Sequence, residues 1–332
     1  MYKLKFLTLF TLLMLTSICF SKTKVLALND FIVPDALKTG DTVAIIAPAN
    51  LPTNAKIQTS KDILKNRGYN PVFYSGTSCD YVKTDEERAA ILNKVFNDPS
   101  IKAIICLRGG YGSSTILDRL DYEAIKRNRP IFVGYSDITA MLTAITQKTG
   151  LVTFHGPMLA SNFDQPKSFD FLFDILSNPK DHIDLEKNID GSKFISLNDK
   201  CGEGQLIGGN LTLISYNMGT PFEIDTKDKI LYLEEIGEAP YRIHGMLTQL
   251  KLSGKLQQAN GIIIGKLTEC DYKNCPNSGI NTVLDFLKSL NLDIPIIYNI
   301  NAGHQPDPIT MPIGANIRIY GNKITILEPV VK

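Results

Sequence analysis

Short apolar runs alternate with amphipathic stretches along the first half of the chain. The runs are nearly continuous, as in parallel strands buried on both faces of a sheet, and they cover residues 43–47, 71–74, 103–107, 131–133 and 151–154. Helical periodicity falls between them, and the clearest helix starts at Thr84, which has capping-box spacing to Glu87. This βαβ alternation predicts an α/β fold with a doubly wound parallel sheet, of the flavodoxin or amidotransferase kind.

A second region of strands and helices follows a less regular stretch. Residues 159–200 contain scattered Pro, Asp and Lys and predict a linker between a first domain over 36–158 and a second over 201–330. A chain of 332 residues is also long for a single core. Strands of the second domain are expected at 230–233, 261–265 and 295–298, helices at 241–252 and 282–290, and a hairpin at 315–327. We therefore expect a C-terminal α/β domain with a mixed sheet.

The first 21 residues have the pattern of a secretory signal peptide. Lys3 and Lys5 precede an apolar run over 6–15, and small and polar residues follow up to Ser21. The run is too short for a comfortable membrane span, so we expect no stable membrane insertion. The pattern predicts a periplasmic or secreted protein rather than a cytoplasmic one, and it leaves the cleavage site open.

Charge and cysteine content narrow the class of partner. Lys and Arg number 35 against 34 Asp and Glu, so no net field favours nucleic acid or an anionic membrane. A small molecule or a peptide is the expected partner. Removing the signal peptide leaves an odd number of cysteines, five, and whether Cys270 and Cys275 are bridged stays open. The chain has no CxxC pair and no HExxH motif, so we predict no metal and no cofactor.

Ser136 is the most informative residue of the chain. It follows the strand 131–133 and a turn opened by Gly134, and residues 138–147 after it have helical character. A serine on a sharp turn between strand and helix is the position of the nucleophile in serine hydrolases. The competing interpretation is that Ser136 only caps the helix.

A glycine-rich loop after a neighbouring strand is expected beside Ser136. Residues 108–112 read Arg-Gly-Gly-Tyr-Gly, and the carboxyl ends of parallel strands share one edge of the sheet. Such a loop lets the backbone approach a ligand closely and aims N–H groups at negative charge. For a hydrolase, the N–H groups of Gly110 and Asp137 are the expected oxyanion hole. The alternative is a plain glycine turn before a helix, because the loop matches neither a P-loop nor GxGxxG.

A serine nucleophile needs a base, and the chain has four histidines. His182 lies in the polar linker and is expected to be solvated, and His244 falls within a helical stretch. His155 follows a strand, where a structural hydrogen bond is its expected role. His304 lies in a loop after the apolar run 295–300, so it is the best candidate for the base.

The carboxylate that orients the base is expected at the end of the strand 230–233. Glu234 and Glu235 follow this strand directly. Alternation along the strand requires one of them to face inward, although acids at a strand end are usually only solvated.

Together these segments resemble the LD-carboxypeptidase family of serine peptidases, which includes microcin-immunity peptidases. The resemblance extends from Gly40 to the C-terminus, and the number, order and spacing of the motifs carry it. The motifs are Gly40-Asp41-Thr42-Val43, Asp85-Glu86-Glu87-Arg88-Ala89, Arg108-Gly109-Gly110-Tyr111-Gly112, Gly134-Tyr135-Ser136-Asp137, His155-Gly156-Pro157-Met158, Gly208-Gly209-Asn210, Leu233-Glu234-Glu235 and Gly303-His304.

The resemblance implies a Ser-His-Glu triad of Ser136, His304 and Glu234. It also implies two domains, a homodimer, no metal, and cleavage of the bond between an L-centre and a terminal D-alanine in murein tetrapeptides. The family often has Asp where this chain has Glu235, which leaves open which of the two acids contacts His304.

The sequence also offers candidate residues for substrate binding, and it leaves two alternative functions open. An exopeptidase must neutralise a terminal carboxylate, for which Arg108 is the candidate, and Tyr111 is the candidate aromatic contact. One alternative is an immunity-type peptidase that cleaves a peptidyl nucleotide. The other is a non-catalytic exported ligand-binding protein, in which Ser136 only hydrogen-bonds the ligand.

Overall fold

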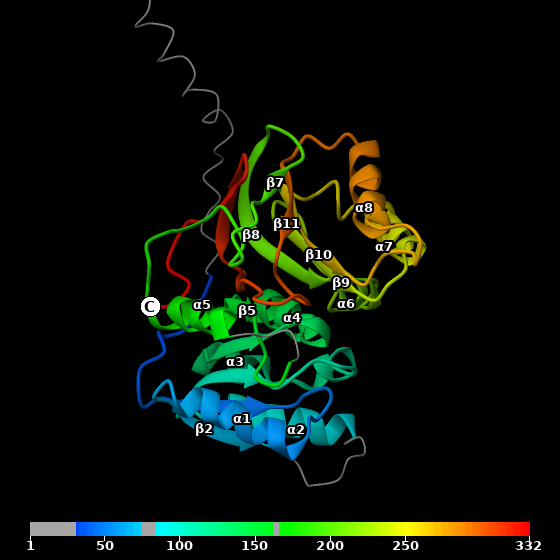
Figure 1. Ribbon diagram of the computed structural model, residues 1–332. Coiled ribbons are helices and arrows are strands. Elements are labelled where there is room, and N and C mark those ends of the chain that lie inside the picture. Colours follow the sequence, from blue (N-terminus) through cyan, green and yellow to red (C-terminus); the bar gives the residue numbers. More distant parts are fainter. Residues whose placement is uncertain (1–30, 75–83, 162–165) are drawn as a thin grey trace, which may run out of the picture. The chain divides into compact units, whose positions relative to one another are not determined.

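Two β-sheets organise the part of the chain that the computed structural model describes, residues 31–74, 84–161 and 166–332 (Figure 1). Residues Ile32–Lys332 form one compact unit that contains both sheets. The predicted signal peptide and Cys79 lie outside the described residues. Among the described residues, no helix is long and apolar enough to cross a membrane.

The first sheet is parallel except at one edge. Its order is β12-β5-β4-β3-β1-β2, and only β12 runs antiparallel to its neighbour. The central strands are mostly apolar and buried because helices cover both faces of the sheet. The strands are β1 (Thr42–Ile46), β2 (Asn70–Tyr74), β3 (Ile101–Cys106), β4 (Ile131–Gly134), β5 (Thr153–His155) and β12 (Met311–Ile313).

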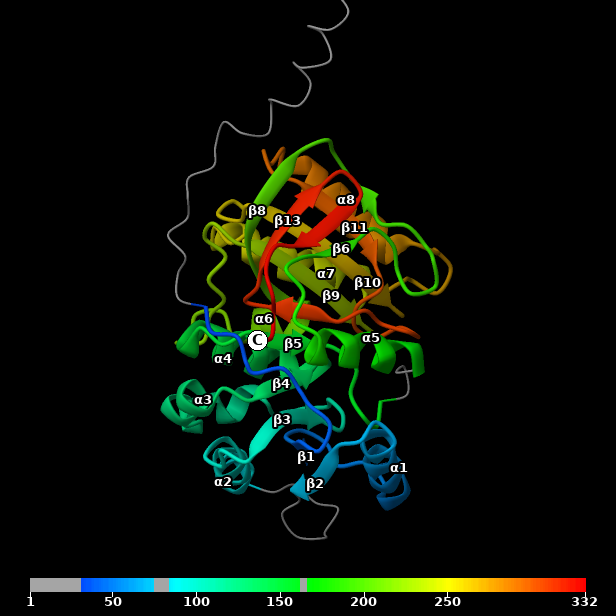
Figure 2. The same cartoon turned by 90° about the vertical axis from the view of Figure 1, so that its left-hand side faces the viewer.

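The helices of this region lie on both sides of the first sheet. Figure 2 shows α2, α3 and α4 on one side and α1 and α5 on the other. The predicted capping box of α2 is present, because Thr84 Oγ1 accepts from the Glu87 N–H at 3.2 Å and Glu87 accepts from the Thr84 N–H at 3.0 Å. The helices are α1 (Asn54–Lys65), α2 (Asp85–Phe96), α3 (Tyr122–Asn128), α4 (Thr139–Thr149) and α5 (Pro166–Ser177), and the 3₁₀ helix η1 spans Ser114–Arg119.

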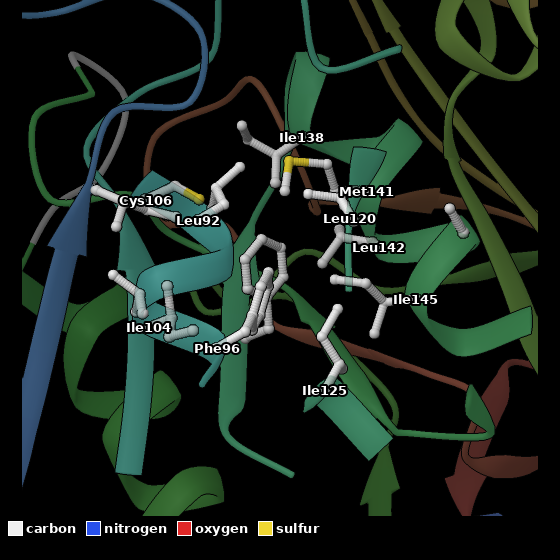
Figure 3. Packing of buried hydrophobic residues seen from close by; sticks show 14 of the residues in the cluster. Leu92, Phe96, Ile104, Cys106, Leu120, Ile125, Ile138, Met141, Leu142 and Ile145 are labelled. Atoms are coloured by element: carbon white, nitrogen blue, oxygen red, sulfur yellow. The ribbon is translucent and has the colours of Figure 1, made fainter. Parts of the chain in front are cut away.

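A continuous apolar core joins α2, α3 and α4 to this sheet. Phe96 of α2 packs on Phe132 of β4, with ring centroids 5.8 Å apart, and Met141, Leu142 and other α4 side chains surround them (Figure 3). Each fully buried side chain of this size contributes about 1.5 to 3 kcal/mol of transfer free energy. The core therefore fixes the start of α4, and Ser136 lies just before it.

The second sheet is mixed. Its order is β6-β14-β13-β8-β9-β10-β11-β7, with β8 to β11 parallel and the outer strands antiparallel. Helices α7 and α8 lie together on one side of it (Figure 1). The elements are β6 (Ile183–Leu185), β7 (Ile195–Ser196), β8 (Cys201–Asn210), β9 (Ile230–Ile236), β10 (Gly261–Thr268), β11 (Ile296–Ile300), β13 (Asn316–Tyr320), β14 (Lys323–Ile326), α6 (Leu211–Tyr216), α7 (Pro240–Leu252) and α8 (Ser278–Ser289).

The predicted fold class is confirmed. The structure differs from the prediction in elements that depend on contacts between residues far apart in the sequence. The stretch 159–200, predicted as a linker, carries α5, β6 and β7, and the domain boundaries remain a prediction. Strand β12 lies within 201–330 but pairs with β5 of the first sheet. Both Cys270, which is buried, and Cys275, which is exposed, are free thiols.

Candidate active site

Ser136 occupies a strained turn between β4 and α4. Its φ angle is +63°, in the left-handed region that disfavours residues with a side chain, and the short 3₁₀ helix η2 (Ser136–Ile138) starts with it. A methyl group on Gly134 would lie 2.7 Å from Ile138 Cγ2, so this tight turn requires glycine. The Ser136 side chain caps neither η2 nor α4. The geometry is that of a nucleophile elbow rather than of a helix cap.

The glycine-rich loop after β3 lies against Ser136, as the sequence predicts. A methyl group on Gly109 would lie 2.9 Å from Ser136 Oγ and 3.4 Å from the Asp137 backbone nitrogen. The carboxylate of Asp137, which is buried, accepts a hydrogen bond from the Ser113 N–H at 2.9 Å. Asp137 thus ties the glycine loop to the serine turn, and Gly110 lies in the same loop.

A partly buried arginine supports the far end of the same loop. Arg88 of α2 donates to the Gly112 carbonyl at 3.0 Å and to the Pro48 carbonyl, after β1, at 2.7 Å. By contrast, Arg108 and Tyr111 are exposed, Tyr111 by 74%, and neither is hydrogen-bonded to another described residue. Their side chains are therefore accessible to a ligand.

His304 and Glu234 form a buried pair. His304 Nδ1 lies 2.9 Å from Glu234 Oε2, and the exposed fractions of the two residues are 6% and 0%. The loop that carries His304 approaches β9 closely because Gly303, with φ +103°, has no side chain: a methyl group there would lie 2.5 Å from Glu234 Oε2. Thr268 Oγ1 donates to the His304 carbonyl at 2.7 Å and holds the loop in place.

The charge of Glu234 is stabilised within this buried pair. Burial by itself raises the pKa of a carboxyl group, but the charge attraction of His304 and His155 and the hydrogen bond with His304 outweigh it and lower the pKa of Glu234 to about 2. Glu234 is therefore ionised at neutral pH. An ionised carboxylate at Nδ1 favours a proton on that nitrogen, which leaves the other ring nitrogen of a histidine able to accept a proton.

Glu235 has a different role from its neighbour. Its carboxylate accepts from the N–H of Thr212 at 2.7 Å and of Ile236 at 2.8 Å, and from the Asn210 side chain at 3.0 Å. Burial and the adjacent charge of Glu234 raise the pKa of Glu235. The structure thus brings Glu234, and not Glu235, to His304, while Glu235 holds the start of α6.

Contacts between the two sheets bring these groups together. The Tyr135 ring, directly before Ser136, meets the His304 ring edge-on with centroids 4.9 Å apart. The Asn210 N–H, at the end of β8, donates to Thr139 Oγ1 at 3.1 Å. The His304 ring therefore lies against the residue that directly precedes Ser136.

The sequence-based interpretation understated one histidine. His155 lies fully buried at the end of β5, with its Nε2 3.8 Å from Glu234 Oε1. Its position directly before a Gly-Pro pair at a strand end was the available signal. His182 and His244 are exposed. Within the described ranges, no group of three or more His, Cys, Asp or Glu side chains is arranged to hold a metal ion.

Comparison with known families covers most of the chain. Residues 43–156 match the model of the LD-carboxypeptidase N-terminal domain, and residues 203–319 match that of the LD-carboxypeptidase C-terminal domain. The first match holds Ser136 and the second holds Glu234 and His304.

Individual relatives agree with the family models. The probable murein peptide carboxypeptidase of Bacillus subtilis is 37% identical, over 89% of this chain and 94% of its own length. The microcin C7 self-immunity protein MccF of Escherichia coli is 30% identical, over 88% of this chain and 94% of its own length. The crystal structure of muramoyltetrapeptide carboxypeptidase from Oxalobacter formigenes superposes with a TM-score of 0.74 at 30% identity, covering 86% of this chain and 97% of that one. The resemblance seen in the sequence is thus confirmed, and this chain belongs to the LD-carboxypeptidase family.

Proposed function

We propose that the protein is a serine carboxypeptidase that releases the terminal D-alanine from murein tetrapeptides. The observation that carries the proposal is the buried 2.9 Å contact between His304 and Glu234, next to the strained turn of Ser136. A hydroxyl is a weak nucleophile, and a base with an ionised partner is what activates it. The 37% identity to a probable murein peptide carboxypeptidase supports the choice of substrate.

In the proposed reaction, His304 takes the proton of Ser136 as Oγ attacks the scissile carbonyl carbon. The N–H groups of Gly110 and Asp137 stabilise the oxyanion, where each donor is worth about 3 to 4 kcal/mol of barrier. The carbon–nitrogen bond then breaks, and His304 gives its proton to the leaving amine of D-alanine. Water, deprotonated by the same histidine, attacks the acyl-enzyme and frees the tripeptide.

Two exposed residues of the glycine loop are proposed to bind the substrate. Arg108 provides the positive charge for the terminal carboxylate, because an exposed guanidinium without a partner among the described residues is available for bidentate binding. Tyr111, also exposed, provides an apolar surface beside it.

A direct test combines a substrate with a probe of the serine. We expect mass spectrometry to detect D-alanine and tripeptide after incubation with murein tetrapeptide, and a fluorophosphonate to label Ser136. Ser136→Ala abolishes both results, while Ser289→Ala, an exposed serine on α8, retains them. An unlabelled wild-type protein would instead support the non-catalytic ligand-binding alternative.

A second candidate substrate follows from the 30% identity to the microcin C7 self-immunity protein. An immunity-type peptidase would use the same triad on a peptidyl nucleotide, with Tyr111 as the aromatic contact for the base. Parallel incubation with murein tetrapeptide and with a peptidyl nucleotide distinguishes the two. Cleavage of the nucleotide conjugate alone contradicts the murein proposal.

We also propose that the protein is exported and dimeric. The pattern of residues 1–21 supports export to the periplasm or the medium, which cell fractionation and sequencing of the mature N-terminus can test. Light scattering of the purified protein tests the homodimer, since a monomer and a dimer differ two-fold in mass.

A further inference from the structure

His155 is a buried histidine that has no role in the proposed reaction. It ends β5 and pairs in register with Gly134, two residues before Ser136. The ring contacts Tyr232 edge-on, with centroids 5.1 Å apart, and Tyr135 at 5.9 Å. Its exposed fraction is 0%, and neither ring nitrogen has a hydrogen-bond partner among the described residues.

Glu234 has a matching unsatisfied atom. Its Oε2 is bonded to His304, whereas its Oε1 is buried without a hydrogen-bond partner in the described part of the chain. The nearest approach of His155 to this carboxylate joins Nε2 to Oε1 at 3.8 Å. That separation is too long for a hydrogen bond, which closes at about 2.9 Å. A buried donor and a buried acceptor are each unfavourable when left unpaired, so closing the gap is favourable.

The end of β8 packs closely against the His155 ring. A methyl group on Gly209, with φ +142°, would lie 3.1 Å from His155 Cδ2 and 2.7 Å from Thr139 Cγ2. Gly209 thus allows the end of β8 to pack against the edge of the imidazole.

We propose that His155 is a positioning residue for the triad, whose Nε2–H donates a hydrogen bond to Glu234 Oε1. The carboxylate is then held between two imidazoles and presents only Oε2 to His304. This inference rests on the proposed function of the site. A fixed Oε2 keeps the proton of His304 on Nδ1, so that Nε2 carries no proton and can accept that of Ser136. The groups that face the His155 ring are Glu234, Tyr232 and Tyr135, and only Glu234 is charged.

Two substitutions test the role of the ring nitrogens in catalysis. His155→Phe keeps a ring against the two tyrosines and removes both nitrogens, and His155→Gln restores an N–H donor. Murein tetrapeptide hydrolysis by His155→Phe should lose about 10- to 100-fold in kcat with little change in KM, and His155→Gln should recover part of the loss. The matched control is His244→Phe, because His244 is an exposed α7 histidine that also meets an aromatic ring, Phe286, edge-on at 5.2 Å.

Histidine ring NMR provides a readout that needs no substrate. We expect a protonated Nε2 of His155 whose resonance shifts in Glu234→Gln and is absent in His155→Phe. A His155 protonated at Nδ1 alone, or a His155→Phe variant with the kcat of an active wild-type protein, overturns the inference. A wild-type protein that neither hydrolyses the peptide nor reacts with fluorophosphonate contradicts the proposed function instead, while the NMR result still decides the His155 contact.

Discussion

The ends of strands β4 and β9 each supply part of the candidate site, and they hold their side chains by different means. At the end of β4, backbone strain positions Ser136, which has a φ angle of +63°. At the end of β9, buried charge and hydrogen bonding position Glu234, whose exposed fraction is 0%. A nucleophile can therefore be fixed by a few consecutive residues, whereas its base and acid depend on segments that meet only in the folded chain.

The largest effect is expected at the β4 end. Ser136→Ala should reduce kcat by about a million-fold, because removing the nucleophile of such a triad removes nearly all of its catalysis. Ser136→Gly should be equally inactive but more stable than Ser136→Ala by about 1 kcal/mol, since glycine relieves the left-handed strain. Tetrapeptide hydrolysis and urea unfolding measure the two quantities. Equal stabilities of the two variants would show that the turn is not strained.

At the β9 end, the two adjacent acids should respond differently to the same substitution. Glu234→Gln should reduce kcat by about 10⁴-fold, because the base loses its ionised partner. Glu235→Gln should mainly lower the free energy of unfolding, by about 1 to 2 kcal/mol, because one N–H donor to that carboxylate loses its acceptor. Kinetics and urea unfolding of both variants check this. A larger loss of kcat in Glu235→Gln would reverse the assignment of the triad acid.

The contact between the glycine loop and the serine turn can be tested with two glycines. Gly109→Ala places a methyl group 2.8 Å from Ser136 Cβ and should reduce kcat by about 100-fold, as a misplacement of about 1 Å at a reacting group does. Gly245→Ala is the control, because a methyl group there has no atom within 4 Å and α7 should gain up to about 1 kcal/mol. A fully active Gly109→Ala protein would mean that the loop moves aside without consequence.

The smallest expected effect is a dependence of stability on pH at the β9 end. The pKa of Glu234 is lowered from 4.5 to about 2 in the fold, so its ionised form contributes stability above pH 4.5 that is lost as the pH falls toward 2. The stability difference between the wild type and Glu234→Gln should therefore be smaller at pH 3 than at pH 7. Urea unfolding at both values measures it, and an unchanged difference would argue against an ionised Glu234.

The strands with the clearest sequence pattern were the easiest to predict. Every predicted strand of the first sheet is present. A continuous apolar run is a clear signal, because a strand that is apolar on both of its faces is buried only in a sheet that helices cover on both sides. Strand β8 was not predicted because its sequence is rich in glycine, and β12 because it is only three residues long. Both strands depend on partners elsewhere in the chain: β8 on β9 and β13, and β12 on β5.

The amino-acid sequence alone was enough to predict the turn of Ser136, the glycine loop, and the candidate roles of His304 and of the pair Glu234 and Glu235. These features are local, because strand, turn and glycine preferences act between residues close in the chain. The tertiary structure was needed to show that Glu234 rather than Glu235 meets His304, and that the Nε2 of His155 lies 3.8 Å from the other carboxylate oxygen of Glu234. Burial and hydrogen bonding of a charge depend on everything packed around it, and that environment exists only once both sheets have come together.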